Sequence, residues 1–109
     1  MRDPDLYREW RRLINMSPRE LRAFIATEDG RNAGTPVGQR SARRILDMLA
    51  TKPADWTGVQ WDWAQRQVSF IKRMRGVDGP LYDGKGRPTR KHLALRLWGY
   101  NPVRARRRM

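Results

Sequence analysis

Three basic side chains stand together at Arg90, Lys91 and His92, directly after Thr89. Thr89 is a suitable helix N-cap, and apolar residues recur after it at helical spacing, which predicts a helix over about residues 90–98. A helix start carries the positive end of the helix dipole and normally attracts acidic side chains. Basic residues there favour an external anion, because the free backbone N–H groups bind phosphate oxygens. The alternative is that the cations turn into solvent or pair with the two aspartates upstream.

A second basic helix start is predicted near the middle of the chain. If Ser41 caps a helix that runs to about Thr51, Arg43 and Arg44 lie in its first turn and Arg40 lies just outside it. Three other predicted helices begin with acidic residues in or near the first turns, as the dipole favours. The two basic starts therefore suggest a pair of phosphate-binding positions.

The charge of the chain supports a polyanionic partner. The net charge is +13, from 24 basic and 11 acidic side chains, and residues 66–109 hold 13 of the basic residues but only two aspartates. Nucleic acid is the first expectation, ahead of an acidic protein or membrane surface. Arginine accounts for 20 of the basic residues, and it binds phosphate through two parallel hydrogen bonds. A genome rich in G and C would also raise the arginine content, but would not place the charge in one part of the chain.

The candidate nucleic-acid-binding residues are the cations at the two helix starts, in the 76–88 segment, at the end of the preceding helix and in the basic C-terminal tail. They are Arg40, Arg43, Arg44, Lys72, Arg73, Arg75, Lys85, Arg87, Arg90, Lys91, Arg96, Arg104, Arg106, Arg107 and Arg108. Cations at a helix C-terminus are also favourable without any ligand, which is the alternative for Lys72, Arg73 and Arg75.

The stretch WTGVQWDW contains three of the five tryptophans. One helix cannot bury Trp56, Trp61 and Trp63 on the same side. Trp56 or Trp61 is therefore a candidate for stacking on a base or for anchoring a protein partner. Packing of all three against neighbouring helices is the alternative, and it is the one that we favour.

Other classes of function have little support in the residues. The chain has no cysteine and one histidine, and its three serines have no neighbouring base. We expect no enzyme, no metal and no cofactor. The chain has no apolar run as long as a membrane span and no signal-peptide pattern at its start, so we expect a soluble intracellular protein without a membrane partner.

Apolar periodicity and turn signals predict an all-α fold, a compact bundle of about five short helices in one domain over residues 1–102. Helices are predicted at 4–15, from Ser17-Pro18 to about 28, at 41–51, at 57–75 and at 90–98. Residues 30–39 are predicted as a loop, 76–88 as a small hairpin or an ordered loop, and 103–109 as a flexible basic tail. The ten-residue loop separates the second and third helices too widely for a standard helix-turn-helix, which favours backbone recognition over sequence readout.

The strings RQVSFIKRMRG and GPLYDGKGRPTRKHLALRLWGYNP, over about residues 66–102, resemble a segment of small basic proteins encoded by bacteriophages. No established activity comes with that resemblance. It implies a setting, either the cytoplasm of a bacterial host or a virion.

Two functions follow as expectations. The first is a phage-type nucleic-acid-binding protein, for DNA rather than RNA, that contacts phosphates through helix N-termini and the basic tail with little sequence specificity. The alternative is a viral protein-binding module, either an inhibitor of a host protein with an acidic groove or an assembly component of the virion.

Overall fold

Helices follow one another along nearly the whole chain in the computed structural model, which describes the backbone of residues 1–107 and the side chains of residues 1–105. Within that part there are seven α-helices, one turn of 3-10 helix (η1) and no strand, which confirms the all-α prediction. The elements are α1 (Pro4–Leu13), α2 (Pro18–Ala26), α3 (Glu28–Asn32), α4 (Pro36–Leu49), η1 (Pro53–Asp55), α5 (Gly58–Arg75), α6 (Arg90–Leu97) and α7 (Pro102–Arg107).

Side chains that accept backbone N–H groups set the starts of the helices. Ser17 and Glu20 form a reciprocal capping box at α2, and Thr57 and Gln60 form another at α5. Thr89 caps α6 as the sequence predicts. Each cap satisfies N–H groups that the helix itself cannot pair, and so fixes the residue at which the helix begins.

The loop expected at residues 30–39 is wrong in part. Residues 28–32 form the short helix α3, and α4 begins at Pro36 because Thr35 accepts the N–H of Gly38. The Thr35-Pro36 pair is the same start signal that opens α1 and α2. Several glycines around it gave the segment the composition of a loop.

Ser41 is consequently not a helix cap. It lies inside α4, fully buried, where its hydroxyl accepts a hydrogen bond from Gln67 of α5 over 3.2 Å. Gln67 in turn accepts the indole N–H of Trp10 of α1 over 2.7 Å. This buried polar chain joins three helices and pairs groups that would be costly to leave unsatisfied.

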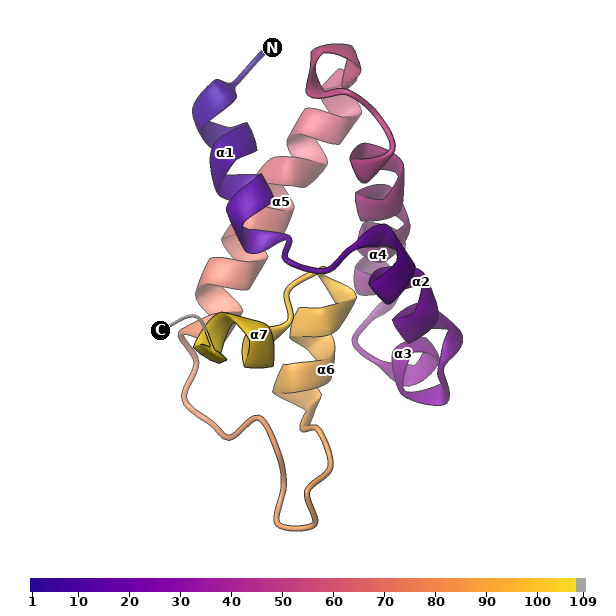
Figure 1. Ribbon diagram of the computed structural model, residues 1–109, viewed down its shortest axis with the longest axis vertical. Helices are drawn as coiled ribbons and strands as arrows, with labels where there is room; N and C mark the ends of the chain where they lie inside the picture. The colour runs from indigo at the N-terminus through magenta and orange to yellow at the C-terminus, as the bar shows by residue number, and fades with distance from the viewer. Residues whose placement is uncertain (108–109) are drawn as a thin grey trace.

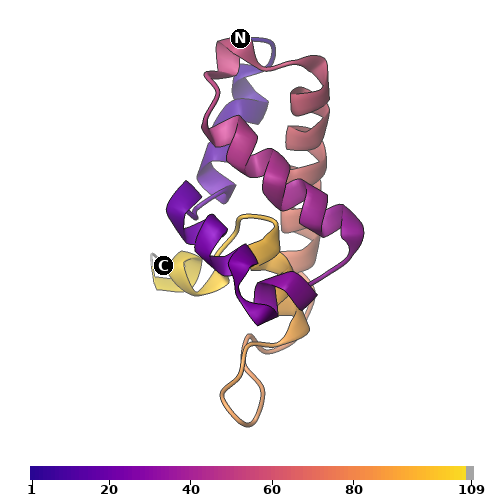
Figure 2. The same cartoon turned by 90° about the vertical axis from the view of Figure 1, so that its right-hand side faces the viewer.

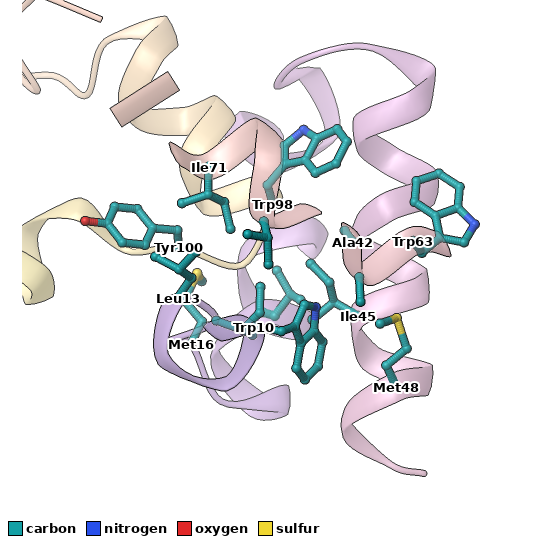
Figure 3. Close-up of a cluster of buried hydrophobic side chains, with 14 of the residues drawn as sticks. Trp10, Leu13, Met16, Ala42, Ile45, Met48, Trp63, Ile71, Trp98 and Tyr100 are labelled. Atoms are coloured by element: carbon teal, nitrogen blue, oxygen red, sulfur yellow. The ribbon is translucent and has the colours of Figure 1, made fainter. Parts of the chain in front are cut away.

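Side chains from most of the helices meet in one core, with Trp10 of α1, Ile45 of α4 and Ile71 of α5 directed toward its interior (Figure 3). Trp56 and Trp61 belong to this core, with exposed fractions of 7% and 4%. Trp63 is buried as well, so packing of all three clustered tryptophans against neighbouring helices is confirmed, and the exposed stacking or anchoring residue is absent among them. The residues before α5 turn Trp56 back onto the end of α4, where its indole N–H donates to Met48 O.

The 76–88 segment is an ordered loop with one isolated bridge between Tyr82 and Pro88. The Asp83 carboxylate accepts the backbone N–H groups of Lys85 and Arg87, and these bonds hold the pKa of Asp83 below its usual range. In Figure 1 this loop projects from the end of the molecule opposite the N-terminus.

The chain after Asn101 is helical where a flexible tail was expected from residue 103. Asn101 caps α7 by accepting the N–H groups of Val103 and Arg104, and Arg104 bonds to Glu20. The last two residues of the expected tail lie outside the described part of the chain. None of the helices in residues 1–107 combines the length and apolar character needed to span a membrane.

Candidate nucleic-acid interface

Two of the three basic residues in the first turn of α6 are held by hydrogen bonds to the preceding loop. His92 is completely buried, its Nδ1 lies 3.0 Å from Leu81 O, and Arg96 Nε donates to its Nε2 over 2.9 Å. Arginine can only donate, so Nε2 is the acceptor and Nδ1 carries the proton. Burial lowers the pKa of His92, and the charge of Arg96 lowers it further. His92 is thus a neutral structural residue.

Lys91, the neighbouring cation, is also engaged. Its Nζ donates to Val77 O, which ties the start of α6 to the loop that follows α5. Of the three basic residues in this turn, Arg90 is the exposed one. The helix start expected to bind phosphate therefore offers one exposed cation among its three basic residues.

The second basic helix start predicted from the sequence does not exist. Because α4 begins at Pro36, Arg43 and Arg44 lie two turns inside the helix, away from its free N–H groups. Arg43 is exposed and Arg44 is half-buried. These residues are available as cations on a helix surface, not as part of an N-terminal anion site.

Two further candidates are neutralised by carboxylates. Lys72 pairs with Glu9 of α1 at 2.9 Å, and its hydrogen bond holds the pKa of Glu9 below the usual range. Arg104 pairs with Glu20 of α2 and also donates to Asn15 O. These bonds use donors that a phosphate would otherwise take.

A different group of cations gathers around the start of α4. Two hollows, each of about 440 Å³, meet at Thr35. The first, between α3 and α4, is lined by Arg31, Arg40 and Arg43. The second, between α4 and α5, is lined by Arg66 and Arg73. We call the five residues the arginine belt: Arg31, Arg40, Arg43, Arg66 and Arg73.

No carboxylate lines either hollow among the described side chains, and no belt arginine takes part in an ion pair there. Arg31 donates one N–H to Ala26 O over 2.9 Å and keeps its other donors. Five guanidinium groups without a carboxylate between them form a strongly positive surface. An anion with several charged oxygens is the ligand that such a surface accommodates.

Aromatic rings support the two belt arginines of α5. The guanidinium carbon of Arg66 lies 4.8 Å from the ring centre of Trp63, and that of Arg73 lies 5.9 Å from the ring centre of Phe70. Phe70 stacks in turn on Trp98, with ring centres 4.1 Å apart. Stacking holds each guanidinium by its face and leaves the N–H groups on its edge free to bind an oxygen.

The remaining predicted residues lie apart from the belt. Lys85 and Arg87 are exposed in the 76–88 loop, and Arg75 lies at the end of α5, where it lines another hollow together with Lys91. Arg96 donates its Nε–H to His92 and is half-buried. The side chains of Arg106 and Arg107, and all of Arg108, lie outside the described residues.

Arg31 and Arg66 are belt residues that sequence reasoning missed. Arg66 stands three residues after Trp63, and this spacing places a cation beside an aromatic ring on a helix. That signal was available. Arg31 lies in the segment predicted as a loop, and no local pattern connects it with α5.

Comparison with known proteins gives one match. The model of the family described as "Protein of unknown function (DUF3140)" matches residues 9–96, which begin within α1, end within α6 and include all five belt arginines. No curated protein and no solved structure matches the chain.

Proposed function

We propose that this chain, which belongs to the family described as protein of unknown function (DUF3140), is a nucleic-acid-binding protein. The arginine belt contacts the phosphate backbone, with DNA preferred over RNA and with little dependence on sequence. The observation that carries the proposal is that five guanidinium groups line two adjoining hollows in which no described carboxylate offsets their charge.

The choice of phosphate as the ligand follows from the donors. Each belt arginine presents N–H groups in a planar fork that matches two phosphate oxygens. Repeated phosphates along a strand can occupy several forks at once, which a single small anion cannot. Arg90 and Arg75, both exposed, and the C-terminal Arg106, Arg107 and Arg108 enter the proposal as auxiliary contacts that add non-specific affinity.

The resemblance of residues 66–102 to basic bacteriophage proteins supports a phage-derived protein that acts in the host cytoplasm or in the virion. The other function expected from the sequence, a protein-binding module, relied on Trp56 or Trp61 as an anchor. Burial of both side chains removes that anchor, so nucleic-acid binding is the function we carry forward.

The test is binding of the purified, nuclease-treated protein to labelled duplex DNA over a series of salt concentrations. Each phosphate contact lowers the slope of log K against log salt by about 0.9. Arg66→Gln combined with Arg73→Gln removes two belt charges, and we expect the slope to become shallower by about 2.

A control that removes the same formal charge is available on α1. Arg8→Gln combined with Arg11→Gln removes two exposed cations, of which Arg8 pairs with Asp5, and neither lines a belt hollow. At physiological salt and above, where charges outside the contact are screened, its slope should equal that of the unchanged protein. Equal slopes for both variants, or binding that vanishes below physiological salt, would rule out the proposal.

A further inference from the structure

Helices α3 and α4 are joined by three residues, Ala33, Gly34 and Thr35. Gly34 has a φ of +62°, a conformation that favours glycine, and the chain reverses there within a short space. Two helices joined by a turn of three or four residues that contains glycine are the arrangement of a helix-turn-helix. The sequence argued against this motif on the ground of a ten-residue loop at 30–39, and α3 and α4 together occupy that loop except for residues 33–35.

The placement of α3 against α4 is rigid. A Cβ on Gly30 would lie 1.9 Å from Phe24 O, so α3 approaches α2 as closely as a backbone without a side chain allows. Gln39 of α4 donates its side-chain N–H groups to Gly30 O over 2.9 Å and to Ala33 O over 3.0 Å. Gln39 is therefore committed to holding α3 and is not free to read a base.

The outer face of α4 is a narrow exposed stripe that carries two arginines. Its buried residues are Gly38, Ser41, Ala42, Ile45 and Met48. The exposed residues Pro36, Arg40, Arg43 and Asp47 follow each other at intervals of four, three and four, which places them on one side of the helix. In Figure 2 α4 crosses the front of the molecule, and no other element lies before it.

The dimensions of α4 suit one particular site on a duplex. A helix with its side chains is about 10–12 Å wide, and the major groove of B-form DNA is about 12 Å wide. Arg31 lines the hollow between α3 and α4, and Arg66 and Arg73 line the hollow between α4 and α5. A groove is bordered by a phosphate strand on each side, and this arrangement supplies cations to both.

We infer, as an extension of the proposed function, that residues 36–43 of α4 lie in the major groove of B-form DNA. Arg40 and Arg43 face the base edges, while Arg31, Arg66 and Arg73 contact the bordering phosphates. Asp47, farther along the same stripe, stays outside the groove because phosphate repels it. Arginine donates to the N7 and O6 atoms of guanine, so any preference among bases falls on guanine.

The experiment is dimethyl sulfate probing of a short duplex saturated with the 109-residue chain. The reagent methylates guanine N7 in the major groove and adenine N3 in the minor groove, so one reaction reports on both. We expect protection of guanine N7 and unchanged reactivity of adenine N3. Arg40→Gln combined with Arg43→Gln should remove the guanine protection and weaken binding by about tenfold. The Arg8/Arg11 variant should keep the guanine protection and the affinity of the unchanged protein.

Circular dichroism of each variant checks that the fold is intact. A duplex RNA of the same sequence should bind about tenfold more weakly, because its deep and narrow major groove does not admit a helix. Binding at physiological salt with protected adenine N3, or with neither atom protected, would refute the groove placement and leave the phosphate-binding function standing. Absence of binding to any duplex at that salt would refute both.

Discussion

Glu20 shows how one side chain can serve two elements. Its carboxylate accepts the backbone N–H of Ser17 over 3.1 Å at the start of α2, and it pairs with Arg104 of α7. The hydrogen bond from Arg104, followed by that from Ser17, lowers the pKa of Glu20 to about 2. A carboxyl whose pKa is lowered by folding stabilises the fold while it is ionised, and that contribution is lost as pH falls through the folded-state pKa.

We therefore predict that Glu20→Gln lowers the free energy of unfolding by about 1 kcal/mol at neutral pH, a small value because the side chains of both partners are partly exposed. The difference from the unchanged protein should be complete above about pH 4.5 and should disappear as the pH approaches about 2. Thermal unfolding followed by circular dichroism across this range measures it. Glu28→Gln, which removes an exposed carboxylate from the start of α3, is the control. A difference that persists unchanged at pH 2 would contradict the assigned role.

At the scale of elements, the start signals decided how far the sequence could predict the fold. Asp3-Pro4 and Ser17-Pro18 precede strong apolar periodicity, and both helices begin as expected. Thr35-Pro36 gives the same signal but is followed by Gly38, which lowers helix propensity. The fold leaves little room for a side chain at that position, because a Cβ on Gly38 would lie 2.8 Å from Leu97 Cδ2. A tertiary contact of this kind leaves no local trace in the sequence.

Helix α3 was also missed because it depends on tertiary contacts. Five residues that include a glycine are too short and too weak to form a helix alone. Gln39 supplies part of what is missing, since its side chain binds carbonyl groups at the end of α3. Helix α3 is thus stabilised in part by α4. The sequence pattern within α3 could not predict a helix that depends on this contact.

We predict that Gln39→Ala loosens α3 selectively. The carbonyls of Gly30 and Ala33 lose their partners, which should cost about 1–2 kcal/mol. Hydrogen exchange of the backbone amides at residues 31–33 should accelerate more than that of α5. Gln65→Ala, which removes a glutamine with one side-chain bond, to Ser69, is the matched control and should leave α3 exchange unchanged. If α3 amides exchange at the same rate in both variants, Gln39 does not hold the helix.

For the whole molecule, the distribution of basic residues along the sequence differs from their distribution over the folded surface. The sequence placed nearly all the excess in residues 66–109, yet three of the five belt arginines come from residues 31–43. Folding brings the start of α4 beside α5, while Lys72 and Arg104 are neutralised by carboxylates from the first part of the chain. The basic character was predictable, but its location depends on helix packing that only the structure gives.

The position of the arginine belt predicts how the DNA affinity of charge variants depends on salt concentration. The protein extends over 45 × 29 × 21 Å, and the screening length is about 30 Å at 0.01 M salt and about 8 Å at 0.15 M. At low salt every cation acts on the DNA, so the Arg40/Arg43 variant and the Arg8/Arg11 variant should lose affinity by similar factors. At physiological salt only cations in contact still act, and the Arg40/Arg43 variant alone should lose about tenfold. Fluorescence anisotropy of a labelled duplex measures both conditions. Equal losses at 0.15 M would mean that net charge, without the belt, accounts for binding.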